Sequence, residues 1–85
     1  MPKLNWRIIG PEITEAREQL EAIEGRIKSG KPPNSVEFQI MIQHAYHHLN
    51  FAWNARHWPL RRYAHLTDDD FHAGGELPAD LDFED

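Results

Sequence analysis

Apolar residues recur at three- and four-residue steps in the first third of the chain. They are Ile13, Ala16, Leu20, Ile23 and Ile27. In an α-helix this spacing gathers the apolar side chains in one stripe, while the glutamates between them turn to solvent. Pro11 suits a first helical turn, and the stretch SGKPPNS from Ser29 onward stops a helix. The pattern therefore predicts a helix over residues 11–29.

A second helical pattern follows this short connection. It opens at Asn34 or Ser35, and with Asn34 as the N-cap, Glu37 stands in the capping-box position three residues later. No helix breaker occurs before Pro59. The sequence thus predicts a helix over residues 35–58, and the short connection favours an antiparallel arrangement with the first helix.

This second helix carries two apolar strips instead of one, at about 100° per residue. The major strip consists of Phe38, Met41, Ile42, Ala45, Leu49, Ala52 and Trp53. The opposite strip, with the histidines that share its side, consists of Ile40, His44, His47, Phe51 and Trp58. The first helix can cover only one strip, and we expect it to cover the major one. The opposite strip needs a second cover, either the C-terminal segment or another copy of the chain.

The C-terminal part begins with a compact helix-start signal. Thr67 is a good N-cap, and three aspartates fill the turn that follows it. This pattern predicts a short helix over residues 68–73. The acidic tail, residues 74–85, also carries Leu77, Leu81 and Phe83, so we expect it to dock partly on the body of the protein.

The pattern as a whole predicts an all-α fold in a single small domain, residues 1–85. Residues 11–29 and 35–58 would form an antiparallel hairpin, with the short C-terminal helix beside it. Because one strip of the hairpin lacks a cover, we expect homodimerisation into a four-helix bundle. The predicted interaction surface is the opposite strip: Ile40, His44, His47, Phe51 and Trp58.

Composition narrows the possible functions of the chain. Its 85 residues include no cysteine, which excludes disulfides, thiolate nucleophiles and metal sites built on sulfur. We expect a cytoplasmic protein, because no signal-peptide pattern and no membrane-spanning apolar run is evident. A chain this small leaves little room for a closed pocket, and no catalytic motif is present, so we expect a non-enzymatic interaction protein.

The charge is divided unevenly along the chain. All nine lysines and arginines, but only six of the fourteen acids, lie in residues 1–67, which leaves residues 68–85 with a net charge of −8. The basic aromatic stretch contains Arg56, Trp58, Arg61, Arg62 and Tyr63. These residue types could bind phosphates and stack on bases, with the acidic tail masking them. Alternatively, the arginines neutralise the helix end and simply pair with the tail.

Histidines are concentrated in the second helix. His44 and His48, or His44 and His47, are spaced so that either pair could chelate a divalent metal, with Glu37 as the nearest carboxylate on that side. The competing interpretation makes them hydrogen-bonded residues at a helix–helix or subunit contact. We therefore expect the protein to bind no cofactor, with a divalent metal at these histidines as the alternative.

Overall fold

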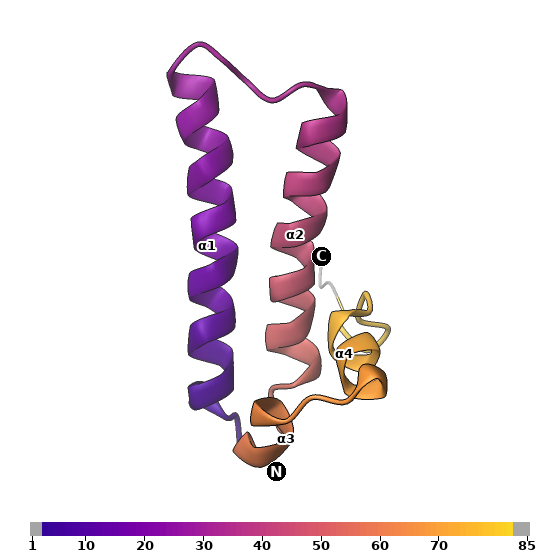
Figure 1. The fold of residues 1–85 in the computed structure, drawn as a ribbon. Helices are drawn as coiled ribbons and strands as arrows, with labels where there is room; N and C mark the ends of the chain where they lie inside the picture. The colour runs from indigo at the N-terminus through magenta and orange to yellow at the C-terminus, as the bar shows by residue number, and fades with distance from the viewer. Residues whose placement is uncertain (1–2, 83–85) are drawn as a thin grey trace.

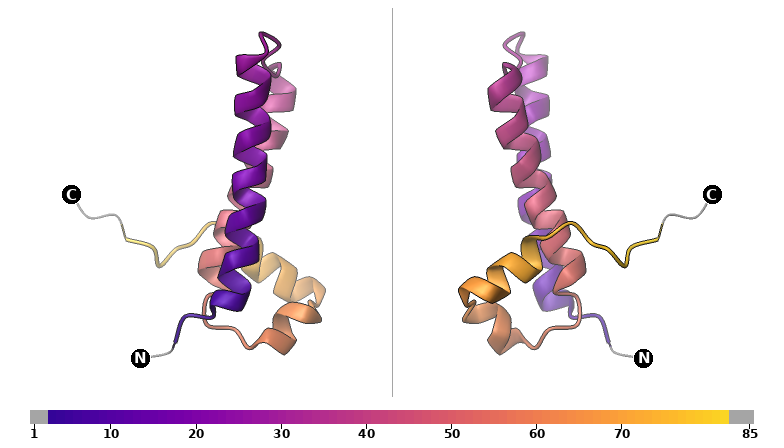
Figure 2. Two further views of the ribbon diagram at one scale, coloured as in Figure 1. Left: turned by 90° about the vertical axis from the view of Figure 1, so that its left-hand side faces the viewer. Right: turned by 90° about the vertical axis from the view of Figure 1, so that its right-hand side faces the viewer.

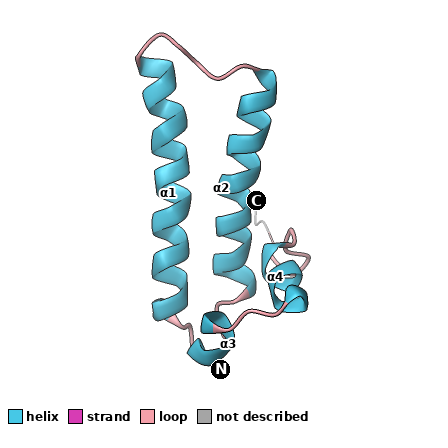
Figure 3. Ribbon diagram, in the orientation of Figure 1, coloured by secondary structure: helices cyan, strands magenta, loops and turns pink. Residues whose placement is uncertain are grey.

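The computed structural model describes residues 3–82, which form four helices and no strand (Figures 1 and 3). They are α1 (Trp6–Lys28), α2 (Ser35–Asn54), α3 (Leu60–Ala64) and α4 (Asp68–Gly75). The all-α prediction is confirmed. The two long helices lie side by side in opposite directions, and α3 and α4 lie near the end at which α1 begins and α2 ends (Figure 1).

Helix α1 begins five residues before the predicted start, so the assignment of Pro11 to the helix start is wrong. The cap is Asn5, whose side chain accepts a hydrogen bond from the backbone N–H of Arg7 at 3.2 Å. Proline inside a helix removes one backbone hydrogen bond and costs on the order of 3 kcal/mol. Burial of Ile8, which has no exposed surface, helps to offset that cost.

Helix α2 has the predicted N-terminus but ends at Asn54, four residues before the predicted end. Asn34 is the cap, and its capping box with Glu37 is present. Beyond the helix, the backbone bonds to the start of α1 instead: Asn5 donates to the carbonyl oxygens of Arg56 at 2.6 Å and Trp58 at 2.9 Å. These two bonds hold the N-terminus of α1 against the C-terminal end of α2.

Helices α3 and α4 follow α2 and pack against the helix pair. Pro59 precedes α3, a short helix that the sequence pattern did not predict. In α4, Thr67 is the cap as predicted, and it forms a capping box with Asp70. The helix includes Gly74 and Gly75, two residues beyond the predicted end. Figure 2 shows α3 and α4 on one side of the helix pair and residues 80–82 on the other.

Phe51 lies at the centre of the core, where all four helices meet. Its side chain is 1% exposed, and it forms the buried cluster with Ile8 and Ala55. The rings of Trp58 and Tyr63 pack edge-on against it, with centroids at 5.6 and 6.1 Å. Between α1 and α2 the buried residues are small for the most part: Ala16, Ala45 and Ala52.

The predicted major strip of α2 is only partly covered by α1. Leu49 is 43% exposed and Phe38 is 46% exposed, so the expectation that both are core residues is wrong. On α1, Ala16 and Ile23 are buried as the stripe predicts, whereas Ile13, Leu20 and Ile27 are exposed. Phe83 lies outside the described residues. None of the described helices combines the length and the apolar character that crossing a membrane requires.

Gly74 should be intolerant of any side chain, because a methyl group there would overlap the Phe51 ring. We expect Gly74→Ala to lower the free energy of unfolding by about 1–3 kcal/mol, the usual cost of overpacking a core. Urea denaturation followed by circular dichroism measures this.

Gly25→Ala is the matched control, since a methyl at Gly25 meets nothing within 4 Å. It should stabilise the protein by about 0.5–1 kcal/mol, because alanine loses less backbone entropy in a helix. Equal effects of the two substitutions would contradict the close packing of α4 on Phe51.

Candidate interaction surface

The three histidines of α2 lie in a row of neighbouring rings that are tilted or edge-on to one another. The ring centroids of His44 and His48 lie 4.8 Å apart, and those of His47 and His48 lie 5.3 Å apart. His47 turns toward α4, where its ring lies 5.0 Å from the ring of Phe71. It therefore packs within the chain, under the C-terminal helix.

His48 turns the other way, toward α1. Its Nδ1 lies 3.1 Å from Oε2 of Glu12, and both side chains are largely buried. Because a carboxylate only accepts hydrogen bonds, Nδ1–H is the donor. Among the described residues no partner reaches Nε2, which is buried. The pair thus joins the two long helices through one polar contact in their interface.

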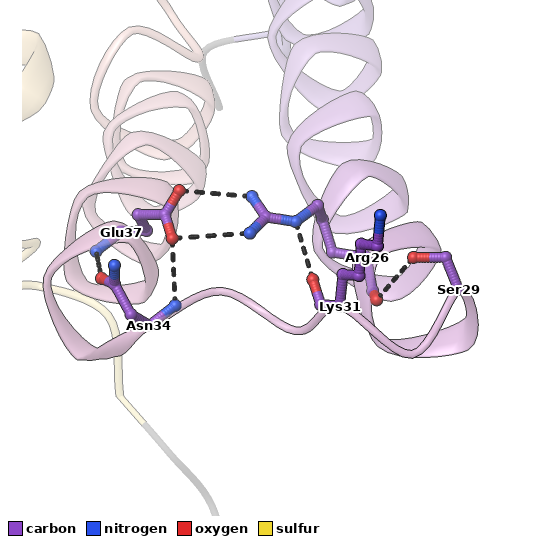
Figure 4. A network of polar contacts seen from close by, with 5 residues as sticks. All are labelled: Arg26, Ser29, Lys31, Asn34 and Glu37. Carbon is purple, nitrogen blue, oxygen red and sulfur yellow. Dashed lines mark hydrogen bonds and ion pairs between the residues drawn. The ribbon is translucent and has the colours of Figure 1, made fainter.

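Two of the predicted metal ligands, His44 and His48, are neighbours, but Glu37 does not join them in one group. Glu37 lies at the loop end of the helix pair, where it accepts hydrogen bonds from Arg26 and the Asn34 backbone (Figure 4). These donors lower the pKa of its carboxyl group, the Asn34 N–H most of all. Within residues 3–82, no group of three or more potential ligands could hold a metal ion.

Two of the candidate nucleic-acid contacts are already paired with acids of the C-terminal part. Arg62 lies 3.7 Å above the Trp58 ring and donates to Asp70 at 2.8 Å, which lowers the pKa of that carboxyl group. Arg56 lies 3.8 Å above the ring of Trp53 and reaches Asp80.

Of the other candidate contacts, Trp58 lies under Arg62, and Arg61 and Tyr63 differ in their exposure. Arg61 is exposed. Tyr63 is half-buried, and burial raises the pKa of its hydroxyl group. The five side chains therefore do not form one open basic surface.

The predicted interaction strip is divided by the fold. Phe51 is buried inside the chain, so its assignment to an interaction surface is wrong. His47 packs against it from within α2, and Trp58 packs against it from the turn that follows α2. Only Ile40 and His44 remain exposed. The reason is that α3 and α4 fold back over this side of α2, which is one of the two covers that the sequence left open.

Large apolar side chains instead form rows on the side of the helix pair opposite α3 and α4. On α1 the row repeats every seven residues: Trp6, Ile13, Leu20 and Ile27. On α2 the row consists of Phe38, Ile42, Leu49 and Trp53. We call these two rows the apolar face. Of its eight side chains, six are exposed, with exposed fractions from 43% to 66%.

The lower end of the apolar face, near the start of α1, contains a groove of about 450 Å³, which we call the base groove. Its lining is almost wholly apolar and comes from α1, α2 and both flanking segments: Leu4, Trp6, Ile9, Ile13, Leu49, Ala52, Trp53, Arg56 and Leu81. Leu81 belongs to the acidic tail, so the predicted docking of the tail on the body is seen here.

Three further side chains hold the C-terminal part of the chain against α2. The sequence pattern did not identify them in that role. Asn50 and Asn54 donate to the carbonyl oxygens at the end of α4: Gly75 at 3.0 Å and Gly74 at 2.9 Å, respectively. Asp80 accepts a hydrogen bond from Trp53 Nε1 at 2.9 Å. Asn50 and Asn54 are four residues apart and therefore lie on the same side of α2. This spacing could have indicated that both side chains bind the same neighbouring segment.

Comparison with known proteins finds no matching family model, no matching curated protein and no matching solved structure.

Asn54 should contribute strongly to the docking of α4, because its amide also donates to the Glu76 carbonyl oxygen at 2.7 Å. Removing a donor leaves these carbonyl groups unsatisfied, which costs about 1–3 kcal/mol. We expect Asn54→Ala to lower the free energy of unfolding by that amount. Gln43→Ala, an exposed position on the same helix, should change it by less than about 0.5 kcal/mol; an equal loss would contradict the assigned role.

His47 should make stability depend on pH. Burial and the neighbouring His48 lower its pKa below the ordinary value of 6.5. As the pH falls below 6.5, the unfolded chain binds a proton that the native state does not yet bind, so stability falls. The loss levels off below the lowered pKa of the native state.

Denaturation midpoints between pH 7.5 and 5 measure this effect. We expect His47→Gln to lose less stability over this range than the wild type, whereas His65→Gln, at an exposed position, keeps the wild-type slope. Identical slopes for all three proteins would be evidence against the titration of His47.

Proposed function

We propose that this protein is a non-enzymatic assembly protein that acts as a homodimer, in which the apolar faces of two copies pack into a four-helix bundle. One observation carries the proposal. The large apolar side chains that repeat every seven residues on α1 are exposed. Ala16 and Ile23, three residues after Ile13 and Leu20, are buried toward α2. Such large side chains act as knobs that require holes on a facing helix.

The packing inside the helix pair supports this arrangement. Ala16, Ala45 and Ala52 fill the contact between α1 and α2 with small side chains, so little apolar surface is buried there. Most of the large aliphatic side chains of the repeat lie outside it. If another layer of helices covered these side chains, each half-exposed leucine or isoleucine would contribute about 1 kcal/mol of hydrophobic free energy.

The size of the face agrees with what a stable dimer needs. A row from Trp6 to Ile27 is about 33 Å long at 1.5 Å per residue. Two helices at an interaxial distance of 8–10 Å present a width of about 18–20 Å. The product is roughly 600 Å² on each copy, close to the ~800 Å² per partner of standard interfaces.

Charge at the edges of the face favours a second copy as its cover. On the α1 edge, Arg17 pairs with Glu21 at 3.4 Å and Lys28 pairs with Glu24 at 3.5 Å, so the edge is neutral in sum. The α2 edge carries the uncharged side chains Gln39, Gln43 and Tyr46. Two identical faces can therefore meet without like charges opposing one another, which a symmetric interface requires.

This dimer differs from the one that the sequence pattern predicts. The predicted surface ran through Phe51, which the chain itself buries, and through His47, which α4 contacts. Ile40 and His44, its exposed remainder, lie outside the proposed interface.

Sedimentation equilibrium of matched variants tests the proposal. We expect a wild-type dimer, and Leu20→Glu should raise its dissociation constant at least about a hundredfold, because a carboxylate would be buried without a partner. Ile40→Glu is the control: Ile40 is also exposed, at 61%, but it lies outside the interface. Circular dichroism checks that each variant stays helical.

A wild-type monomer at several hundred micromolar would overturn the dimer. Dissociation by Ile40→Glu but not by Leu20→Glu would place the second copy on the predicted strip instead.

A further inference from the structure

The acidic tail makes one specific contact with the base of the apolar face. The carboxylate of Asp80 accepts hydrogen bonds from Trp53 Nε1 at 2.9 Å and from Arg56 Nη2 at 3.4 Å. The next residue, Leu81, lies in the base groove. A carboxylate and the following apolar side chain are thus bound side by side.

The carboxylate-binding pair is held in place by the body of the protein and not by the tail. Arg56 donates from Nη1 to the backbone carbonyl oxygen of Trp53 at 2.7 Å, and its guanidinium lies 3.8 Å above the Trp53 ring. Its side chain is only 20% exposed, whereas Asp80 is 65% exposed. A donor pair fixed in advance binds a carboxylate at a lower entropic cost.

The tail leaves much of the groove uncovered. Leu81 is itself 36% exposed, and the groove walls Leu4 and Trp6 remain 43% and 66% exposed. Leu81 forms one wall of the groove, and about 450 Å³ stays open beside it. The site therefore accepts a larger apolar group, or more than one, beside the carboxylate.

We propose that the base groove is a docking site for an extended acidic segment of a partner protein, in which an aspartate or glutamate precedes a large apolar residue. Arg56 and Trp53 bind the carboxylate, and the groove takes the apolar side chain. The chain's own Asp80-Leu81 is the internal competitor, favoured by its high effective concentration. The partner binds by displacing it.

This inference rests on the Asp80 contacts and not on the proposed dimer. A second copy would also cover Trp6 and Ile13, so the two kinds of partner compete for the base of the face. Binding is therefore measured at a protein concentration at which sedimentation shows monomers.

The probe is a fluorescein-labelled peptide with the sequence ELPADLDFED, that of residues 76–85. The full chain carrying Asp80→Asn and Leu81→Ser has a weakened internal competitor, and we expect it to bind this peptide at least about tenfold more tightly than the wild type does. Fluorescence polarisation measures the affinity. The same two substitutions made in the peptide should weaken its binding about tenfold or more.

Arg56→Gln, added to the tail variant, should weaken peptide binding about tenfold, as loss of a charged hydrogen bond does. Arg62→Gln is the matched control, since Arg62 pairs with Asp70 and should leave the affinity unchanged. Equal binding by the wild type and the tail variant would overturn the inference, as would a peptide whose affinity survives loss of its aspartate and leucine. If the tail variant instead binds no peptide but dimerises more tightly, the groove belongs to the second copy: the inference fails and the dimer stands.

Discussion

The burial of Phe51 is the constraint on which the arrangement of this protein depends. Its ring contacts α1 through Ile8, α3 through Tyr63 and α4 through the bare backbone of Gly74. An aromatic ring on a helix pair this small cannot be covered by one neighbouring helix, so the chain turns after α2 and returns over it. The turn at residues 55–59, the short α3 and Gly74 of α4 together cover this one large side chain, whereas Gly75 lies against His47.

Covering that side leaves the opposite side open. The two short helices of the C-terminal segment pack on Phe51 and His47. The chain after α4 then passes to the other side of α2, where Leu77 and Leu81 lie beside Leu49 and Trp53 (Figure 2). The apolar face there is long, regular and neutral at its edges. Its upper part suits a second copy of the chain, and its base adds a carboxylate-binding pair. The self-association surface and the groove for a short acidic segment, as proposed, thus lie on the same open side of one small domain.

Polar contacts hold the helix pair at both ends and in its middle. At the loop end Arg26 meets Glu37, at the other end Asn5 donates to Arg56 and Trp58, and between them His48 meets Glu12. The capping box at Asn34 could be predicted, because it depends on residues three positions apart. The bonds of Asn5, fifty-three residues away from Trp58 along the chain, could not, since no local pattern relates two such distant groups.

The sequence by itself determined the helical class, the start of α2 at Asn34 and the start of α4 at Thr67, because each depends on periodicity or on capping within one turn. It also revealed that α2 has two apolar strips. Only the tertiary structure decided which strip the chain covers for itself. That choice depends on where residues 55–75 return, and hence on long-range packing around Phe51, which no local spacing encodes. For the same reason the proposed dimer surface lies on the seven-residue row of α1 and not at Phe51 and Trp58. The large side chains of that row look like core residues in the sequence but are exposed in the fold.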